Sequence, residues 1–155
     1  MFIDIPGRKI LEIKNLVFDY NGTLGVDGKL INGIGQKLRA AKELYNIYVI
    51  TADTYGTAVS QCRQWDIAVM VFSGEQIAKE KRKYVSTLGA HETICIGNGV
   101  NDIEMFEEGA LSIAVIGEEG CAGKLLCAAD IIVKDIKDAL DLVLNPKRMK
   151  ATLRG

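Results

Sequence analysis

The stretch LVFDYNGTL, residues 16–24, decides the fold. Its apolar start, residues 16–18, has strand character and ends at Asp19, and Asn21 and Gly22 then break the pattern. We therefore predict a buried strand that delivers a carboxylate to its own carboxyl end, followed by a glycine turn whose backbone amides can approach a ligand. A carboxylate at the end of a buried strand destabilises the fold, so its presence there indicates a functional role. Asp19 is therefore the first candidate site residue.

Apolar runs and helical patterns alternate along the rest of the chain. Further strands are predicted at residues 46–51, 67–72, 93–96, 111–116 and 131–133. Helices are predicted between and after them, starting near residues 34, 58, 77, 103, 122 and 136. This alternation predicts βαβ units, and hence an α/β fold: three layers with a doubly wound, mostly parallel, Rossmann-like sheet that has helices on both faces.

The length of 155 residues fits one domain, residues 1–155. Residues 1–14 are interpreted as an extended lead-in that forms an edge strand or a short hairpin. Residues 147–155 form a basic tail without acids, which we interpret as a solvated terminus rather than a binding arm. Ordinary helices and strands of the fold account for residues 24–50 and 52–80. We therefore expect no cap domain, that is, no second domain inserted there to cover the site.

Composition argues against several classes of function. With 48% hydrophobic residues, 25% charged residues and a formal net charge of −1, the chain is an ordinary globular protein without the basic footprint of nucleic-acid binding. It has no membrane-spanning run and no signal-peptide pattern at its start, so we predict a cytoplasmic protein. The four cysteines show no CxxC spacing and are interpreted as free thiols, and the single histidine, His91, as a surface residue.

Polar residues follow three of the predicted strands. Asp19 follows the first, Thr51 ends the second, and Asp102 closes the loop GNGVND, residues 97–102, after the fourth. In parallel sheets of this kind, ligands bind beyond the carboxyl ends of the strands, at a switch in strand order. The sequence therefore predicts one crevice that contains two acids and a hydroxyl.

A lysine completes this set. Lys81 lies four residues from both Ile77 and Val85 on the apolar face of a predicted helix, so its ammonium points inward and needs an anionic partner. Two acids, a hydroxyl, an inward lysine and glycine turns suit phosphoryl transfer. Asp19 would attack phosphorus to give an aspartyl-phosphate, while Lys81 and Mg²⁺ would offset the charge of the phosphate.

These pieces resemble the haloacid dehalogenase superfamily of phosphatases and phosphoryl-transfer enzymes. The first motif of that superfamily is DxDGT, or DKTGT in P-type ATPases, and it is similar to DYNGT here. TADTYGTA, residues 51–58, resembles the TGDNxxTA of P-type ATPases, and GNGVND resembles their GDGxND. P-type ATPases also have a lysine that is followed by an apolar residue four positions later and a leucine seven positions later, which matches Lys81, Val85 and Leu88. Residues 114–133 resemble the segment that follows the GDGxND motif in those proteins.

The resemblance covers residues 16–144 and is greatest to small proteins described as soluble P-type ATPases, which consist of the phosphorylation domain alone. It implies Mg²⁺ as cofactor, Asp19 as nucleophile and the carbonyl of residue 21 as a metal ligand. The candidate catalytic residues are Asp19, Asn21 and Lys81. The candidate phosphate-binding residues are Gly22, Thr23, Thr51, Ala52, Lys81 and Asn101. The candidate metal ligands are Asp19, Asn21, Asn98 and Asp102.

Two asparagines depart from the pattern. Asn21 stands where most phosphatases of this superfamily have a general acid/base aspartate, and losing such a group slows a reaction by roughly 10² to 10⁴. We therefore predict a slow hydrolase with a long-lived phosphoenzyme. Asn98 replaces a metal-binding aspartate by a neutral oxygen donor, which would hold Mg²⁺ more weakly. Asp53 is interpreted as an N-cap of the next helix rather than a ligand.

Three functions remain open from the sequence. The favoured one is a Mg²⁺-dependent hydrolase acting on a phosphorylated substrate, a nucleotide or a sugar phosphate. The second is a non-catalytic phosphate-binding or regulatory module with a degenerate site. The third is a sugar-phosphate phosphatase resembling the capless, tetrameric 3-deoxy-octulosonate-phosphate phosphatases. An uncapped site is open, so we also expect a large substrate, a partner protein or a homo-oligomer.

Overall fold

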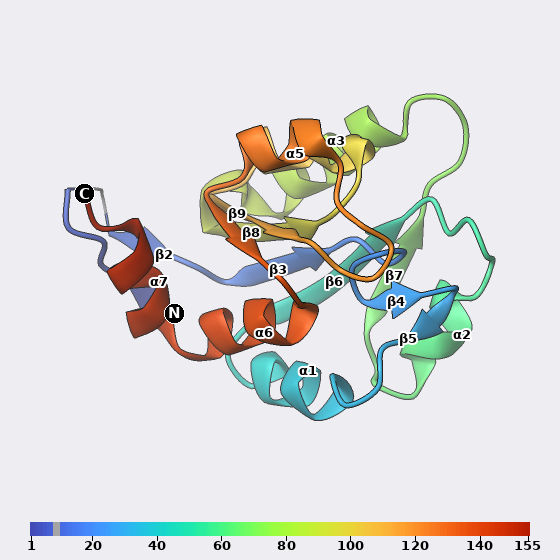
Figure 1. The fold of residues 1–155 in the computed structure, drawn as a ribbon, viewed down its shortest axis with the longest axis horizontal. Helices are drawn as coiled ribbons and strands as arrows, with labels where there is room; N and C mark the ends of the chain where they lie inside the picture. The colour runs from blue at the N-terminus through green and yellow to red at the C-terminus, as the bar shows by residue number, and fades with distance from the viewer. Residues whose placement is uncertain (8–9) are drawn as a thin grey trace.

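The computed structural model describes residues 1–7 and 10–155. Its centre is a six-stranded sheet with the order β10-β9-β8-β3-β6-β7, in which all neighbouring strands are parallel (Figure 1). These strands are β3 (Asn15–Phe18), β6 (Asn46–Thr51), β7 (Ala68–Val71), β8 (Thr93–Gly97), β9 (Leu111–Val115) and β10 (Ile131–Val133). The predicted parallel α/β fold is confirmed, and the strand bounds agree to within one residue.

Helices cover both faces of the sheet (Figure 1). They are α1 (Gly35–Lys42), α2 (Ala58–Arg63), α3 (Ile77–Gly89), α4 (Ile103–Glu108), α5 (Gly123–Ala128), α6 (Ile136–Leu144) and α7 (Pro146–Leu153), with the 3₁₀ turns η1 (Ala90–Glu92) and η2 (Val100–Asp102). Helices α1 and α6 lie together on one face, and α3, α4 and α5 lie on the other. No helix of the described residues is long and apolar enough to cross a bilayer.

The central strand β3 is buried on both of its faces. Leu16 and Phe18 belong to the core beneath α1 and α6, whereas Val17 belongs to the core beneath α3, α4 and α5. Successive side chains of a strand point to opposite faces, so a strand covered on both sides needs an unbroken apolar run. That requirement explains the run at residues 16–18 and assigns Asp19, two residues after Val17, to the α3 face.

Two short hairpins stand outside the main sheet. The lead-in forms the predicted hairpin, with β1 (Phe2–Ile3) antiparallel to β2 (Leu11–Glu12), and residues 8–9 lie outside the described residues. The second hairpin, β4 (Gly25–Val26) with β5 (Lys29–Leu30), was not predicted. Its turn is Asp27-Gly28, both with positive φ of 50° and 73°, a typical tight-hairpin signal.

The basic tail forms a helix that was not predicted, although its basic side chains Lys147, Arg148 and Arg154 are exposed, as expected of a solvated terminus. Residues 146–153 form α7, because Pro146 fits the first turn of a new helix and Met149 is fully buried against the core. Lys150 pairs with Asp4 at 2.9 Å, which holds α7 beside the lead-in hairpin. The tail therefore covers the amino-terminal hairpin.

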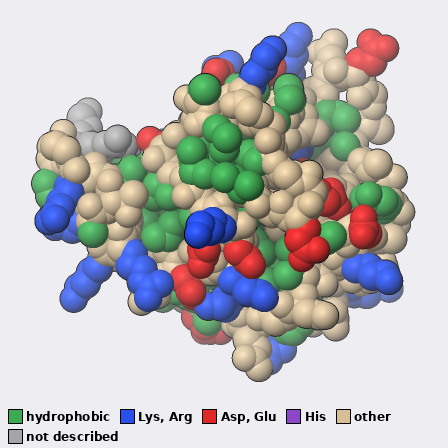
Figure 2. Space-filling view, in the orientation of Figure 1, with side chains coloured by type: hydrophobic (Ala, Val, Ile, Leu, Met, Phe, Trp, Pro, Cys, Tyr) green, Lys and Arg blue, Asp and Glu red, His purple; other side chains and the backbone are tan. Residues whose placement is uncertain are grey.

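The connections after β3 and β6 bear on access to the site. Within the described chain, the connection from β3 to β6 contains the β4–β5 hairpin and α1, and the connection from β6 to β7 contains α2. Neither holds an inserted domain, which agrees with the predicted absence of a cap. Figure 2 shows acidic and basic side chains interspersed on one face of the molecule, with apolar side chains exposed between them.

Candidate functional site

Asp19 lies at the carboxyl end of the central strand. Its backbone N–H donates to the carbonyl of Ile96 at 2.9 Å, so the pairing of β3 with β8 continues one residue past the strand. The Asp19 side chain is nearly buried, with 6% of the residue exposed. Because Asp19 shares a face with Val17, its carboxylate points toward α3.

Helix α3 supplies the cation that faces Asp19. Lys81 lies one turn before Val85, which packs in the same core as Val17, and Lys81 is 0% exposed. Its Nζ donates to Oδ1 of Asp19 at 2.6 Å and to Oδ1 of Asp102 at 2.6 Å. A weaker contact of 3.4 Å reaches Oδ1 of Asn101. The prediction that Lys81 points inward is confirmed.

Asp102 is held by the loop that precedes it. Its Oδ2 accepts the backbone N–H groups of Asn98 at 3.1 Å and Gly99 at 2.9 Å, while its Oδ1 faces Lys81. A Cβ on Gly97 would lie 2.4 Å from that Oδ2, so only glycine lets the strand end approach the carboxylate this closely. Asp102 is fully buried, and its orientation is set by the backbone.

With both carboxyl groups ionised, the cluster Asp19–Lys81–Asp102 carries a net charge of −1, since two carboxylates face one ammonium. Burial, together with the charge of Asp102, raises the pKa of Asp19 to about 7, although Lys81 acts in the opposite direction. Burial acts to lower the pKa of Lys81, but Asp19 and Asp102 outweigh it and raise that pKa. An excess negative charge away from water is costly, so this cluster has a physical reason to bind a further cation.

Asn98 connects two loops at the same edge of the sheet. Its Oδ1 accepts the hydroxyl of Thr23 at 3.2 Å, and its Nδ2 donates to the carbonyl of Gly120 at 3.1 Å. Gly22, with φ of 79°, packs so closely that a Cβ there would lie 2.1 Å from Nδ2 of Asn98. Gly120 lies just past β9, another strand that ends at this edge, and no motif in the sequence marks it.

Thr51 and Asp53 form a separate unit at the end of β6. Oδ1 of Asp53 accepts the backbone N–H groups of Thr57 at 3.0 Å and Ala58 at 3.1 Å, so Asp53 supports the start of α2, although the N-cap residue is Thr57 and not Asp53 as predicted. Asp53 adopts φ of 47°, and its own N–H donates to Oγ1 of Thr51 at 2.9 Å. Within the described residues, no direct hydrogen bond links Thr51 or Ala52 to the Asp19–Lys81–Asp102 cluster.

Asn21 follows Asp19 by two residues. Its Oδ1 is buried and accepts no hydrogen bond from any residue that the structure describes. A buried acceptor without a donor costs roughly 1–3 kcal/mol, so Oδ1 of Asn21 is an unsatisfied polar atom at this edge of the sheet. The structure therefore gathers the predicted site residues at one edge: Asp19, Lys81, Asn101 and Asp102 in one contact group, Gly22, Thr23 and Asn98 in a second, and Asn21 and Thr51 beside them.

The other features noted in the sequence lie away from this edge. His91 is exposed in η1, on the amino side of β8, as predicted. The four cysteines are free, with Cys62 and Cys95 buried in the core, as predicted for two of them, and Cys127 exposed. Their surroundings indicate packing roles for the buried pair.

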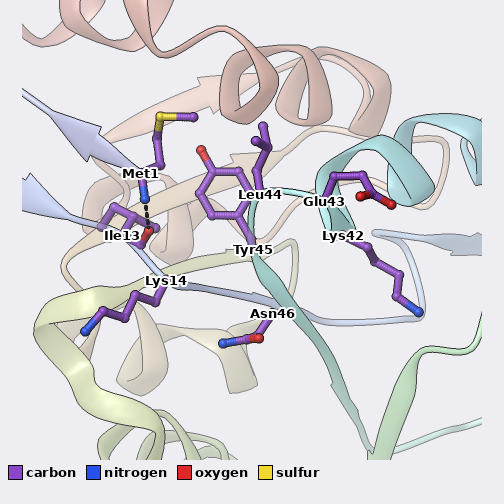
Figure 3. A pocket seen from close by; sticks show the side chains of 8 residues that line it. All are labelled: Met1, Ile13, Lys14, Lys42, Glu43, Leu44, Tyr45 and Asn46. Atoms are coloured by element: carbon purple, nitrogen blue, oxygen red, sulfur yellow. Dashed lines mark hydrogen bonds between the residues drawn. The ribbon is translucent and has the colours of Figure 1, made fainter.

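A cavity of about 300 Å³ lies at the opposite, amino-terminal edge of the sheet (Figure 3). Lys14 and Lys42 line it and extend in different directions in Figure 3. Each is already paired with a carboxylate, Lys14 with Glu92 at 2.6 Å and Lys42 with Asp66 at 3.1 Å. These lysines are therefore engaged in ion pairs. Near the candidate site, a smaller cavity of about 100 Å³ borders Thr23.

Comparison with solved structures identifies the fold. The chain superposes with a TM-score of 0.71 on the cobalt-bound form of the deoxy-D-mannose-octulosonate 8-phosphate phosphatase YrbI from Haemophilus influenzae, at 14% identity over 93% of this chain and 94% of that one. A putative HAD family hydrolase from Streptomyces avermitilis gives a TM-score of 0.67 at 17% identity, over 87% and 84% of the two chains. The chain has the haloacid dehalogenase fold.

A third structure with the haloacid dehalogenase fold contains ligands. It is the 3-deoxy-D-manno-octulosonate 8-phosphate phosphatase from Moraxella catarrhalis in complex with magnesium ion, phosphate ion and KDO, with a TM-score of 0.70 and 17% identity over 92% of this chain and 94% of that one. At these identities the likeness concerns the fold. No protein-family model matches the chain.

Sequence relatives complete the comparison. The chain is 54% identical over 61 residues, 39% of its length, to the uncharacterized protein MJ0073 of Methanocaldococcus jannaschii, and 31% identical over 75 residues, 48% of its length, to phosphoserine phosphatase of Campylobacter jejuni subsp. doylei. These matches span 66% and 34% of those proteins, less than two thirds of either. A match to the uncharacterized protein MJ0072 of M. jannaschii, 41% identical over 39 residues, spans 25% of this chain and 89% of that protein, so the two belong to one family.

Proposed function

We propose that the chain is a Mg²⁺-dependent phosphoryl-transfer hydrolase in which Asp19 accepts the phosphoryl group. The observation that supports this most is the buried Asp19–Lys81–Asp102 cluster at the carboxyl end of the central strand. Ion pairs of this kind seldom add net stability, so their retention favours a chemical role. The ligands in the Moraxella structure and the phosphatase names of several matches support the same reaction class.

Lys81 is proposed to orient Asp19 and to offset the charge of the transferred group. Its ammonium lies 2.6 Å from the carboxylate oxygen that faces α3, so the ion pair fixes the orientation of the carboxylate. The hydroxyl of Thr51, the side chain of Asn101 and the backbone amide of Ala52 are proposed to hold the phosphate oxygens. The predicted donors Gly22 and Thr23 are already engaged, because the Gly22 N–H donates to the carbonyl of Gly25 at 2.8 Å and the Thr23 hydroxyl donates to Asn98.

The residues present fit a magnesium ion. Asp19, the carbonyl of Asn21, Asn98 and Asp102 are all oxygen donors, and Mg²⁺ in proteins typically takes one or two carboxylates and keeps several waters. The net charge of −1 on the ionised cluster favours a cation, and Oδ1 of Asn21 is a further oxygen donor at this edge that accepts no hydrogen bond from the described residues. Both oxygens of Asp102 already accept hydrogen bonds, so we propose that it holds the ion through water. The ion would supply charge neutralisation on the phosphate.

Asn98 is proposed to be a weak ligand. Its Oδ1 already accepts the hydroxyl of Thr23, which leaves one lone pair for a metal, and it brings no charge. An aspartate there would oppose the carbonyl of Gly120, which the Nδ2 of Asn98 contacts at 3.1 Å. Asn98 therefore stabilises the connection between the two loops, and it would bind a metal ion more weakly than an aspartate at the same position.

Asn21 is proposed to make the second half of the reaction slow. Its carboxamide cannot take a proton from the water that hydrolyses an aspartyl-phosphate. Losing general acid/base assistance slows such a step by roughly 10² to 10⁴, so the phosphorylated form of Asp19 persists.

The test uses beryllofluoride, which binds a carboxylate as a phosphoryl mimic and needs no leaving group. With Mg²⁺, ¹⁹F NMR of the wild-type protein should show bound fluoride signals, and these should vanish in Asp19→Asn. Asp27→Asn is the matched control, because Asp27 is exposed at the tip of the β4–β5 hairpin, and it should bind as the wild type does. Equal signals in Asp19→Asn and the wild type would contradict the proposed role of Asp19.

The two asparagines also support a second candidate, a phosphate-binding module without turnover. Asn21 has no proton to exchange, and Asn98 has both of its amide atoms engaged by protein groups. Beryllofluoride binding at Asp19 without phosphorylation by any donor would favour this candidate over the hydrolase.

A further inference from the structure

Three asparagines of the chain directly precede a glycine: Asn21, Asn32 and Asn98. Asparagine is a thermolabile residue, because its side-chain amide can be lost without any enzyme. The loss begins when the backbone nitrogen of the next residue attacks the side-chain carbonyl, and glycine leaves that nitrogen most accessible because it has no Cβ. The three positions share this local chemistry, so the fold decides which of them reacts.

The reaction needs water as its co-reactant. The glycine nitrogen forms a bond to Cγ of the asparagine, the bond from Cγ to Nδ2 breaks, and Nδ2 leaves as ammonia with the proton of the glycine N–H. Water then opens the cyclic imide to aspartate or isoaspartate. The glycine N–H must therefore be free to lose its proton, and the asparagine side chain must be free to turn onto that nitrogen.

Asn21 does not meet these requirements. The N–H of Gly22 donates to the carbonyl of Gly25 at 2.8 Å, so its proton is engaged. A Cβ on Gly22 would lie 2.1 Å from Nδ2 of Asn98, which shows how closely the neighbouring loop packs against this peptide. Oδ1 of Asn21 is buried as well. Deamidation here requires the loop to open first.

Asn98 is held even more firmly. The N–H of Gly99 donates to Oδ2 of Asp102 at 2.9 Å. Both ends of the Asn98 amide are engaged, because Oδ1 accepts the hydroxyl of Thr23 at 3.2 Å and Nδ2 donates to the carbonyl of Gly120 at 3.1 Å. Three hydrogen bonds must therefore break before the side chain can turn onto the glycine nitrogen.

Asn32 meets both requirements. It lies with Gly33 in the turn between β5 and α1, and both residues are exposed. Within residues 1–7 and 10–155, neither the Asn32 side chain nor the Gly33 N–H takes part in a hydrogen bond. Gly33 has φ of 83°, and no atom of another segment lies within 4 Å of the place where a Cβ would stand. The peptide and the side chain therefore have room to move.

We infer that Asn32 is the site of spontaneous deamidation in this chain, and that the fold preserves Asn21 and Asn98 as amides. The aged protein carries an aspartate or isoaspartate between β5 and α1, while the edge of the sheet that holds Asp19 keeps its neutral side chains. Hydrogen bonds and close packing at that edge thus protect its composition against a reaction that the sequence alone would allow. This inference does not depend on phosphoryl transfer at Asp19.

The test follows deamidation of the folded chain with time. Protein kept at mildly alkaline pH and body temperature is sampled, digested and mapped by mass spectrometry, with aspartate and isoaspartate peptides separated from the parent peptide. We expect Asn32 to convert first and Asn21 and Asn98 to convert at least about tenfold more slowly, because these two react only through local opening. Conversion of Asn21 or Asn98 at the rate of Asn32 or faster overturns the inference.

Two controls separate the fold from the sequence. In urea-denatured protein the three asparagines should convert at similar rates, whereas the same order of rates as in the folded chain would mean that the sequence sets it and would overturn the inference. Asn32→Gln, at an exposed position, lengthens the side chain so that the attack must close a larger ring, and the folded variant should therefore gain acidic groups far more slowly than the wild type. An equal gain in both proteins also overturns the inference.

Discussion

The two edges of the central sheet differ in the charge of their buried polar side chains. At the amino-terminal edge, the buried Asn15 donates to the carbonyl of Leu88 at 3.0 Å and accepts the amide of Asn46 at 3.0 Å. All of these groups are neutral. At the carboxyl edge, Asp19, Lys81 and Asp102 are charged and share a space that is almost closed to solvent.

This difference distinguishes polar groups that stabilise the fold from polar groups that take part in a reaction. A satisfied neutral network keeps its hydrogen bonds at modest cost, whereas removing each ion from water costs several kcal/mol. The charges that the amino-terminal edge does carry remain partly exposed, as in the pair Lys14–Glu92 with 48% and 21% exposed side chains. Among the described residues, buried charge occurs at the carboxyl edge alone, which is the observation that supports the proposed site there.

The largest effect is expected from Asp19→Asn. Phosphoryl labelling should fall to background, because the nucleophile is gone, while the free energy of unfolding of the metal-free protein should rise by about 1 kcal/mol, since the net negative charge of the cluster is removed. Labelling and urea denaturation measure the two quantities. A clear loss of stability would show that Asp19 stabilises the fold and would remove the contrast between the edges.

Lys81→Met should be the most destabilising change. It leaves two buried carboxylates without a cation, and breaking a buried ion pair in this way costs about 3–5 kcal/mol. Urea denaturation should show the loss, and Mg²⁺ should restore part of it by supplying positive charge. The control is Lys79→Met, because Lys79 is exposed two residues earlier on α3 and should unfold as the wild type does.

Asn15→Ala examines the neutral edge. It removes the partners of the Leu88 carbonyl and the Asn46 amide, so the free energy of unfolding should fall by about 1–3 kcal/mol. Because Asn15 lies at the other end of β3 from Asp19, phosphoryl labelling of the folded protein should be unchanged. A labelling defect comparable with that of a site variant would mean that the two edges are not independent.

The smallest effect is expected from Lys14→Met. The Lys14–Glu92 pair is exposed enough for solvent and salt to screen it, and such pairs contribute little. Thermal unfolding at low and high salt should match the wild type within error. A substantial drop in Tm would show that a charged pair at the amino-terminal edge stabilises the fold, contrary to the comparison drawn above.

Much of the fold followed from local pattern. The apolar runs predicted the six parallel strands because the strands of a parallel sheet covered by helices are mostly apolar. The β4–β5 hairpin was missed although Asp27-Gly28 is a turn signal, because its strands are two residues each and carry no periodicity. Helix α7 was missed because its stability depends on Met149, whose burial needs a surface that only the folded chain provides.

For the site, the sequence by itself determined which residues share one edge of the sheet: strand ends that carry Asp19, Thr51 and the 97–102 loop, and an apolar helix stripe that turns Lys81 inward. The reason is that the carboxyl ends of parallel strands share one edge and helical spacing sets a side chain's direction. Only the tertiary structure decided that one ammonium contacts both carboxylates and that Asn98 connects two loops. Those contacts depend on distances of 2.6–3.2 Å between segments far apart in the chain, which no local pattern encodes.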